Sequence, residues 1–149
     1  MNRLILIIAA GVAAASIVGS SHARASAAQT LDLTGVATTQ RVTLDVAPKG
    51  ESPGDMGIKA GTLYAKGKRV GHYEGECVLL PSHSSLCSFT LALHGGQILI
   101  QSGYGNGLND GSTVHEPIIG GSGAYAGARG EGVDREQGGK DIFHLQILR

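Results

Sequence analysis

Apolar and polar residues alternate along most of the chain after residue 30, in short runs separated by glycine- and proline-rich stretches. The clearest run is residues 87–94, where odd positions are apolar and even positions are small or polar. Alternation with a period of two is typical of a strand that buries one face. Similar runs predict strands at residues 31–36, 41–46, 56–65, 70–80, 97–102, 113–119, 128–136 and 141–148.

The segments between these runs predict antiparallel connections. Lys66-Gly67-Lys68 is a hairpin turn between two predicted strands, and Gly95-Gly96 is a two-residue connection of the kind that primed turns require. No helical period persists over about ten residues after the leader described below. About eight strands at a spacing of roughly ten residues predict an all-β sandwich or closed barrel. The interior of such a barrel either fills with side chains or leaves room for one small ligand.

Residues 118–133 combine a high density of glycine with one aromatic residue, Tyr125. Glycine adopts positive φ freely and lets one backbone pass close to another. We therefore interpret this segment as a tight barrel corner, with Tyr125 closing the end of the barrel. The spacing of Gly121, Gly123 and Gly127 loosely resembles a dinucleotide fingerprint, but that motif opens a helix. Further glycines interrupt any helix here, so nucleotide binding is not predicted.

The first 25 residues have the pattern of a secretory signal peptide. Arg3 precedes an apolar run from Leu4 to Val18, and Ala23-Arg24-Ala25 supplies a small-x-small end. The apolar run is shorter than the roughly 20 residues of a membrane span. We therefore predict a signal peptide at residues 1–25 and a mature domain at residues 26–149. The predicted location is secreted, periplasmic or in the cell envelope, with no membrane span after cleavage; a retained anchor helix is the alternative.

The mature domain is predicted to have a net charge close to zero. The whole chain carries 12 basic and 12 acidic residues, and loss of Arg3 and Arg24 with the leader leaves a small acidic excess. A nearly neutral surface offers no electrostatic footprint for nucleic acid. Tryptophan is absent, so the core is expected to consist of Leu, Ile and Val.

Cys77 and Cys87 are the two cysteines of the chain, and a Pro/Ser-rich stretch lies between them. In an exported protein such a pair predicts one disulfide that joins two neighbouring antiparallel strands. Closing so short a loop contributes about 2–3 kcal/mol. A free thiol in the wall of a cavity is the alternative.

Several glycine-rich and core motifs follow one another along residues 45–148. They are Gly54-Asp55, residues 68–71, residues 75–79, residues 96–101, and above all Ile119-Gly120-Gly121-Ser122-Gly123-Ala124-Tyr125-Ala126-Gly127-Ala128, which continues into Arg129-Gly130. These motifs resemble the allene oxide cyclase barrel family and its relatives, the plant dirigent proteins. The resemblance implies an eight-stranded antiparallel closed barrel of the calycin type with an apolar cavity. It also implies no metal and no organic cofactor, and a homo-oligomer, either a trimer or a dimer.

The resemblance implies a function in handling small molecules. Plant allene oxide cyclases close an unsaturated fatty-acid epoxide to a cyclopentenone, and dirigent proteins orient phenoxy-type intermediates. Both hold a reactive, mostly apolar molecule in one productive conformer. We therefore expect a secreted barrel that binds an apolar small molecule; if it is an enzyme, it is an isomerase or cyclase. The alternatives are a non-catalytic dirigent-like orienting protein and a structural cell-envelope barrel without a pocket.

Only some of the functional residues of these two families have counterparts in this chain. Arg129 matches the dirigent arginine after the corner, His115 falls where dirigent proteins have a carboxylic acid, and Asp45 lies where both families have a functional polar residue. These three are the candidate catalytic residues, and Tyr104 and Tyr125 are the candidate ligand-binding residues. Each also has a structural interpretation: a rim ion pair for Arg129, a surface position for His115, and a cap on the barrel mouth for Tyr104.

Two positions depart from the cyclase pattern. The cyclases have an asparagine in the strand after Gly54-Asp55, where this chain has Gly61 nearby, and Cys77 sits where they have a cavity cysteine but here has Cys87 as a potential partner. The departure at Gly61 argues against the same plant substrate, and so does the predicted secreted location. His72, Glu74 and Glu76 share one strand face. They are expected to face outward, and no metal site is predicted there.

Overall fold

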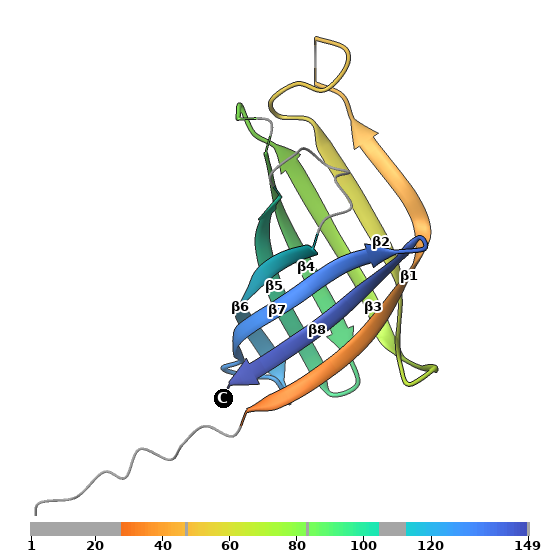
Figure 1. Ribbon diagram of the computed structural model, residues 1–149, viewed down its shortest axis with the longest axis vertical. Coiled ribbons are helices and arrows are strands. Elements are labelled where there is room, and N and C mark those ends of the chain that lie inside the picture. Colours follow the sequence, from red (N-terminus) through yellow and green to blue (C-terminus); the bar gives the residue numbers. More distant parts are fainter. Residues whose placement is uncertain (1–27, 47, 83, 105–112, 149) are drawn as a thin grey trace, which may run out of the picture.

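The protein is described by a computed structural model that covers residues 28–46, 48–82, 84–104 and 113–148 (Figure 1). For residues 40–43 and 104 it describes the backbone only. The predicted signal peptide lies outside these residues. The strands are β1 (Gln29–Leu44), β2 (Met56–Ala65), β3 (Lys68–Leu79), β4 (Ser85–Leu93), β5 (Gly96–Tyr104), β6 (Thr113–Gly123), β7 (Arg129–Gln137) and β8 (Lys140–Leu148). None of the described residues is helical, so no helix among them could cross a membrane.

The eight strands form one closed antiparallel barrel in sequence order. The barrel closes where β8 pairs with β1, from Gln29 opposite Ile147 to Val36 opposite Lys140. This seam decides between the two predicted architectures in favour of the barrel. The runs predicted as separate strands at residues 31–36 and 41–46 are one strand, because β1 continues through two register shifts between Ala37 and Val42. Such irregularities bend a strand without ending it.

The two ends of the barrel differ in their connections, and we name them accordingly. The loop end is the end at which β1, β3, β5 and β7 finish, and the turn end carries the short connections at residues 66–67, 94–95 and 124–127. At the turn end, Lys66 and Gly67 both have positive φ, 49° and 75°, as a primed hairpin turn requires. The next turn is one residue earlier than predicted, because Gly96 already pairs with Leu93.

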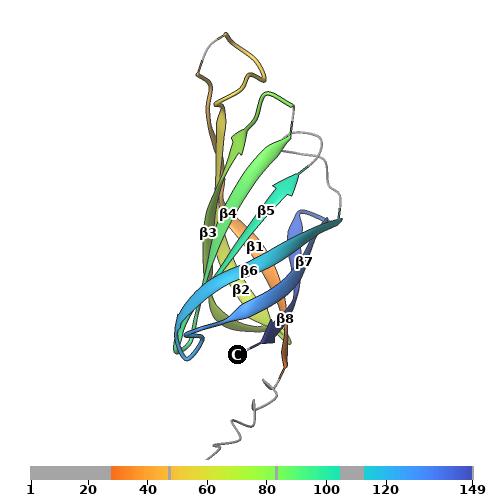
Figure 2. The ribbon, with the colours of Figure 1, turned by 90° about the vertical axis from the view of Figure 1, so that its left-hand side faces the viewer.

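The glycine corner also lies at the turn end (Figure 2). The sequence predicts a strand that ends at Ile119, but β6 continues to Gly123 and pairs with β5 as far as Gly96. A Cβ atom on Gly121 would lie 2.4 Å from the carbonyl oxygen of Tyr125 and 2.8 Å from that of Gln97. A side chain is therefore excluded where the turn folds back on the sheet. Glycine here lets two backbone segments approach each other closely without interrupting the strand.

Apolar side chains fill the interior in the half of the barrel nearer the turn end. The buried members of this apolar cluster are Leu33, Leu63, Tyr73, Cys87, Phe89, Leu91, Ile98, Ile100, Ile118, Ala128, Phe143, Leu145 and Ile147. Most of them come from the strand halves next to the short turns. The rings of Tyr73 and Phe143 meet edge to face at a centroid distance of 5.9 Å and an angle of 68°. Tyr125 packs against this cluster from the glycine corner, which agrees with its predicted place at the end of the barrel.

Candidate functional site

Several buried polar side chains lie in the half of the interior nearer the loop end, together with the apolar Leu79 and Val114. We call six of the polar side chains the inner polar cluster: Lys59, Tyr73, Ser102, Glu116, Asp134 and Asp141. The alternation of buried and exposed residues along the strands shows which side chains point into the barrel. In β6, for example, Val114, Glu116 and Ile118 are buried while His115 and Pro117 are exposed. A carboxylate thus occupies an inward position between two apolar ones.

Asp141 joins two other members of the inner polar cluster. Its Oδ1 accepts a hydrogen bond from Lys59 Nζ at 2.5 Å, and its Oδ2 accepts one from the Tyr73 hydroxyl at 2.7 Å. The three residues come from β8, β2 and β3, so their side chains must pass over β1 and β2 to meet. Both carboxylate oxygens of Asp141 are therefore engaged, one by a cation and one by a neutral donor.

Two glycines make this meeting possible. Gly35 of β1 pairs with Asp141, and a Cβ atom there would lie 3.0 Å from the ring of Tyr73. Gly61 of β2 pairs with Tyr73, and a Cβ atom there would lie 2.5 Å from the same ring. The Tyr73 ring thus lies against a stretch of wall that has no side chains. The close approach of the Tyr73 ring explains why position 61, where this chain departs from the cyclase pattern, is a glycine.

The pKa of the Tyr73 hydroxyl is raised far above its usual value. Burial is the main cause, followed by the hydrogen bond to Asp141 and then by the charges of Asp141, Asp134 and Glu136. Tyr73 is therefore a neutral hydrogen-bond donor at physiological pH.

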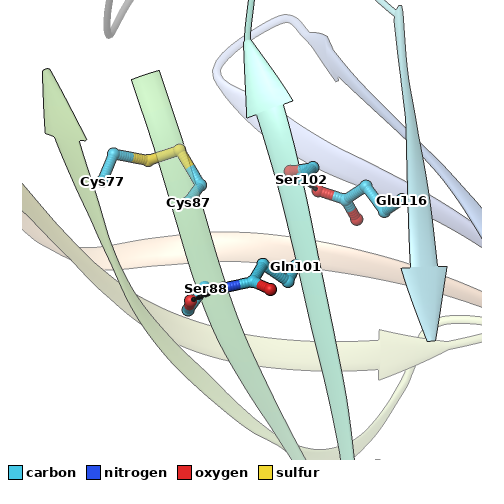
Figure 3. The surroundings of a disulfide bond; sticks show 6 residues. All are labelled: Cys77, Cys87, Ser88, Gln101, Ser102 and Glu116. Atoms are coloured by element: carbon cyan, nitrogen blue, oxygen red, sulfur yellow. Dashed lines mark hydrogen bonds between the residues drawn. A yellow bond between two sulfur atoms is a disulfide. The ribbon is translucent and has the colours of Figure 1, made fainter. Parts of the chain in front are cut away.

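Glu116 and Ser102 lie beside the disulfide on neighbouring strands (Figure 3). The Ser102 hydroxyl donates to Glu116 Oε1 at 3.0 Å, and Glu116 is fully buried. Cys77 and Cys87 form the predicted disulfide, and they pair in register with a Cα–Cα distance of 4.0 Å. Cys87 in turn pairs with Ser102. The disulfide, the serine and the glutamate therefore follow one another across β3, β4, β5 and β6.

The Gly54-Asp55 motif organises the loop end rather than the interior. Asp55 Oδ1 accepts a hydrogen bond from the Val46 amide at 2.9 Å, and Oδ2 accepts one from the Ser52 amide at 2.8 Å. The backbone of Asp55 accepts a hydrogen bond from the Leu79 amide at 2.8 Å. The amides of Val46 and Ser52 lower the pKa of this carboxyl group because they stabilise its charged form. Asp55 thus fixes the connection between β1 and β2 to the end of β3.

The three candidate catalytic residues are exposed and lie in different parts of the barrel. Arg129 begins β7 at the turn end, whereas Asp45 lies in a loop-end connection, where Oδ2 accepts a hydrogen bond from the Gly50 amide at 3.3 Å. His115 contacts Glu131 on the outer face of the sheet, and both side chains are exposed. The structure does not bring the three together. Any role they have is exerted at the surface rather than toward the interior.

The two candidate ligand-binding tyrosines also lie apart. The backbone of Tyr104 pairs with Ser85 at the loop end, and its side chain lies outside the described part of the structure. Tyr125 is half-buried against the apolar cluster. It therefore lies at the opposite end from the inner polar cluster.

The sequence prediction missed the inner polar cluster, although two strands carried a signal for it. In residues 114–118 a glutamate replaces an apolar residue at the centre of an alternating run, and Asp141 begins the alternating run of Phe143, Leu145 and Ile147. As built, the cluster offers one cation, two hydroxyl groups and three carboxyl groups, which can hold the polar atoms of an organic molecule. No group of three metal-ligating side chains suited to an ion occurs within the described ranges.

Comparison with known proteins identifies the fold. No protein-family model and no curated protein matches the chain. Pyocyanin demethylase is 26% identical, with a TM-score of 0.71, over 80% of this chain and all of that one. A pterocarpan synthase dirigent protein is 17% identical (TM-score 0.63; 85% and 97% covered), and the Diels Alderase AbmU from Streptomyces koyangensis is 16% identical (TM-score 0.64; 82% and 63% covered).

Proposed function

We propose that this chain, which has the barrel fold of the allene oxide cyclase and dirigent-like superfamily, binds a mainly apolar small molecule inside the barrel near the loop end. One observation carries the proposal: the interior buries Glu116, Asp134 and Asp141 and the greater part of Lys59. Burial of ionisable groups is unfavourable compared with apolar side chains of similar volume. A barrel with a purely structural role would gain stability by replacing them.

The chemistry expected of such a site is orientation assisted by hydrogen bonds. A protein that holds a flexible molecule in a reactive conformer supplies much of a reaction barrier without a strong acid or base. The names of the similar structures, a demethylase, a pterocarpan synthase dirigent protein and a Diels Alderase, all refer to reactions of organic molecules. If this chain catalyses a reaction, we propose an isomerisation or cyclisation of the bound molecule. Binding and orientation without turnover is the alternative within the same site.

The proposed function includes export from the cytoplasm. The disulfide between Cys77 and Cys87 fits an oxidising compartment, and the first 25 residues have the composition of a signal peptide. N-terminal sequencing of protein recovered outside the cytoplasm should place cleavage near residue 25. A thiol count on the unreduced protein should find no reactive cysteine, and two reactive thiols would contradict this part of the proposal.

Ligand binding can be tested with one inward and one outward position on the same strand. Ser102 of β5 is buried and faces the interior of the barrel, whereas Gln101 points to the outer face and contacts Ser88. We expect Ser102→Phe to weaken the binding of a neutral naphthalene-based fluorescent probe at least about tenfold by filling the interior, a free-energy change of about 1.4 kcal/mol. Gln101→Phe should leave the affinity unchanged.

Overpacking can also destabilise a core, so the melting temperature of both variants is compared with that of the parent. The nearly isosteric Glu116→Gln provides a second test, since it alters the interior without adding volume. Absence of binding to the parent protein, or equal binding by parent, Ser102→Phe and Glu116→Gln, would reject the proposed function.

A further inference from the structure

Lys59 is distinct among the basic residues of this barrel. It lies on β2 between Gly57 and Gly61, both buried, so strand alternation turns its side chain toward the interior. The Lys59 side chain is 22% exposed. Every other lysine and arginine whose side chain is described is exposed. These residues are Lys49, Lys66, Lys68, Arg69, Arg129, Arg135 and Lys140.

The surroundings of Lys59 fix the direction of its ammonium group. Asp141 accepts a hydrogen bond from Nζ with one oxygen, while Tyr73 donates to the other oxygen. Because both oxygens are engaged, rotation of the carboxylate would break one of these bonds. An ammonium group has three hydrogen-bond donors and no acceptor. The contact with Asp141 uses one donor, so the others can serve an oxygen atom of a ligand.

The wall opposite Lys59 has the opposite charge character. In a closed barrel of eight strands, β2 and β6 are four strands apart in either direction. Lys59 and Glu116 therefore belong to opposite walls. A molecule between them meets a hydrogen-bond donor on one side and a carboxyl group on the other. This arrangement distinguishes the two ends of a ligand, which apolar walls alone do not.

We propose that Lys59 binds an acceptor oxygen of the ligand, and that Asp141 and Tyr73 are positioning residues for its ammonium group. This inference rests on the proposed function and specifies its ligand class: a mainly apolar molecule that carries a carbonyl, phenolate or carboxylate oxygen. A pure hydrocarbon lacks the atom that Lys59 recognises. A ligand with a cationic nitrogen at this wall would meet a like charge.

Matched probes with a common ring system test the inference. The dissociation constants of 2-ethylnaphthalene, 2-acetylnaphthalene and 2-naphthoate are measured by fluorescence titration against the parent protein. We expect the ketone and the carboxylate to bind about tenfold or more tightly than the ethyl compound, since hydrogen bonds to charged groups are among the stronger ones. In Lys59→Met this preference should disappear while affinity for the ethyl compound remains.

Three further variants separate recognition from folding. Lys68→Met removes an exposed lysine from β3 and should retain the preference. Lys59→Met combined with Asp141→Asn avoids leaving a buried carboxylate without its cation and should again abolish it. Tyr73→Phe should reduce the preference about two- to fivefold, with little change for the ethyl compound, as expected of a positioning residue.

The possible outcomes distinguish the two proposals. If the three probes bind the parent with equal affinity, or if the preference persists in both Lys59 variants, the role of Lys59 is rejected while ligand binding in the barrel stands. If none of the probes binds the parent, the proposed function fails and the inference fails with it. Loss of the preference in the Lys59 variants but not in Lys68→Met supports both.

Discussion

The turn-end half and the loop-end half of the barrel are built from the same eight strands but have different interiors. Near the turn end the interior consists of aliphatic and aromatic side chains, and Tyr125 packs against them from the corner. Near the loop end the inner polar cluster and the disulfide occupy the equivalent positions. One small sheet can thus combine an apolar core in one half with buried polar groups in the other. Polar groups that destabilise one half are tolerated because the other half supplies the apolar core.

The change in character happens within single strands. The buried, inward residues of β8 are Asp141, Phe143, Leu145 and Ile147 in sequence order, and those of β5 are Ile98, Ile100 and Ser102. These two strands thus contribute apolar side chains to one half and a polar side chain to the other, whereas β3 and β6 also place the apolar Leu79 and Val114 near the loop end. Substitutions at matched inward positions should therefore affect stability in one half and ligand recognition in the other.

The largest loss of stability is expected from the apolar cluster. Phe143 is 1% exposed and packs against Tyr73. Phe143→Ala should lower the free energy of unfolding by about 3–5 kcal/mol, because it removes buried area and leaves a cavity. Urea denaturation measures the change. Phe143→Leu is the control and should cost less than about 2 kcal/mol. A loss below about 1 kcal/mol in Phe143→Ala would show that the apolar cluster is not the main source of stability.

The disulfide should have the next largest effect, and the effect should concentrate near the loop end. Cys77 and Cys87 close a short loop between β3 and β4. Replacing both by alanine should lower the free energy of unfolding by about 2–3 kcal/mol. Hydrogen exchange should accelerate around Leu79 and Ser85 but not around Leu91. Uniform acceleration across both halves would contradict a local clamp.

A smaller effect is expected at alkaline pH, from the boundary between the two halves. The raised pKa of Tyr73 means that the folded protein keeps this proton above pH 10, where an unfolded tyrosine loses it. The unfolded state then binds fewer protons, so stability falls as pH rises through this range. Unfolding measured between about pH 8 and 11 should show a steeper decline in the parent than in Tyr73→Phe. Equal slopes would argue against a buried phenol beside Asp141.

Much of the fold could be predicted because strand alternation and turn chemistry are local. The alternation at residues 56–65 predicts a strand with the bounds that the structure shows, and two cysteines at this spacing in an exported chain predict the disulfide between Cys77 and Cys87. The errors have local causes too. The polar stretch after Ala37 predicts a break between strands, and the glycines of residues 120–123 predict a turn. Backbone pairing with the neighbouring strand extends both strands through these residues.

The candidate site could not be predicted to the same extent, because it depends on which face of each strand points inward. Along β7, glycines alternate with charged residues, so Asp134 gives no apolar pattern from which its direction can be inferred. On β2, Lys59 lies between two glycines and has the same ambiguity. The contact of Lys59 with Asp141 joins residues 82 positions apart. The sequence drew attention to His115, whereas its neighbour Glu116 is the residue that faces inward.

The seam between β1 and β8 has a consequence for how the protein acquires its shape. Gln29 pairs with Ile147, so the barrel cannot close until the last strand has been synthesised. Pairing between positions so distant in sequence is slow compared with local hairpin formation. A polypeptide that emerges from its first strand onward must keep the edge of β1 unoccupied in the meantime. Unpaired strand edges are prone to aggregation, and a chaperone that covers this edge would raise the yield of closed barrels.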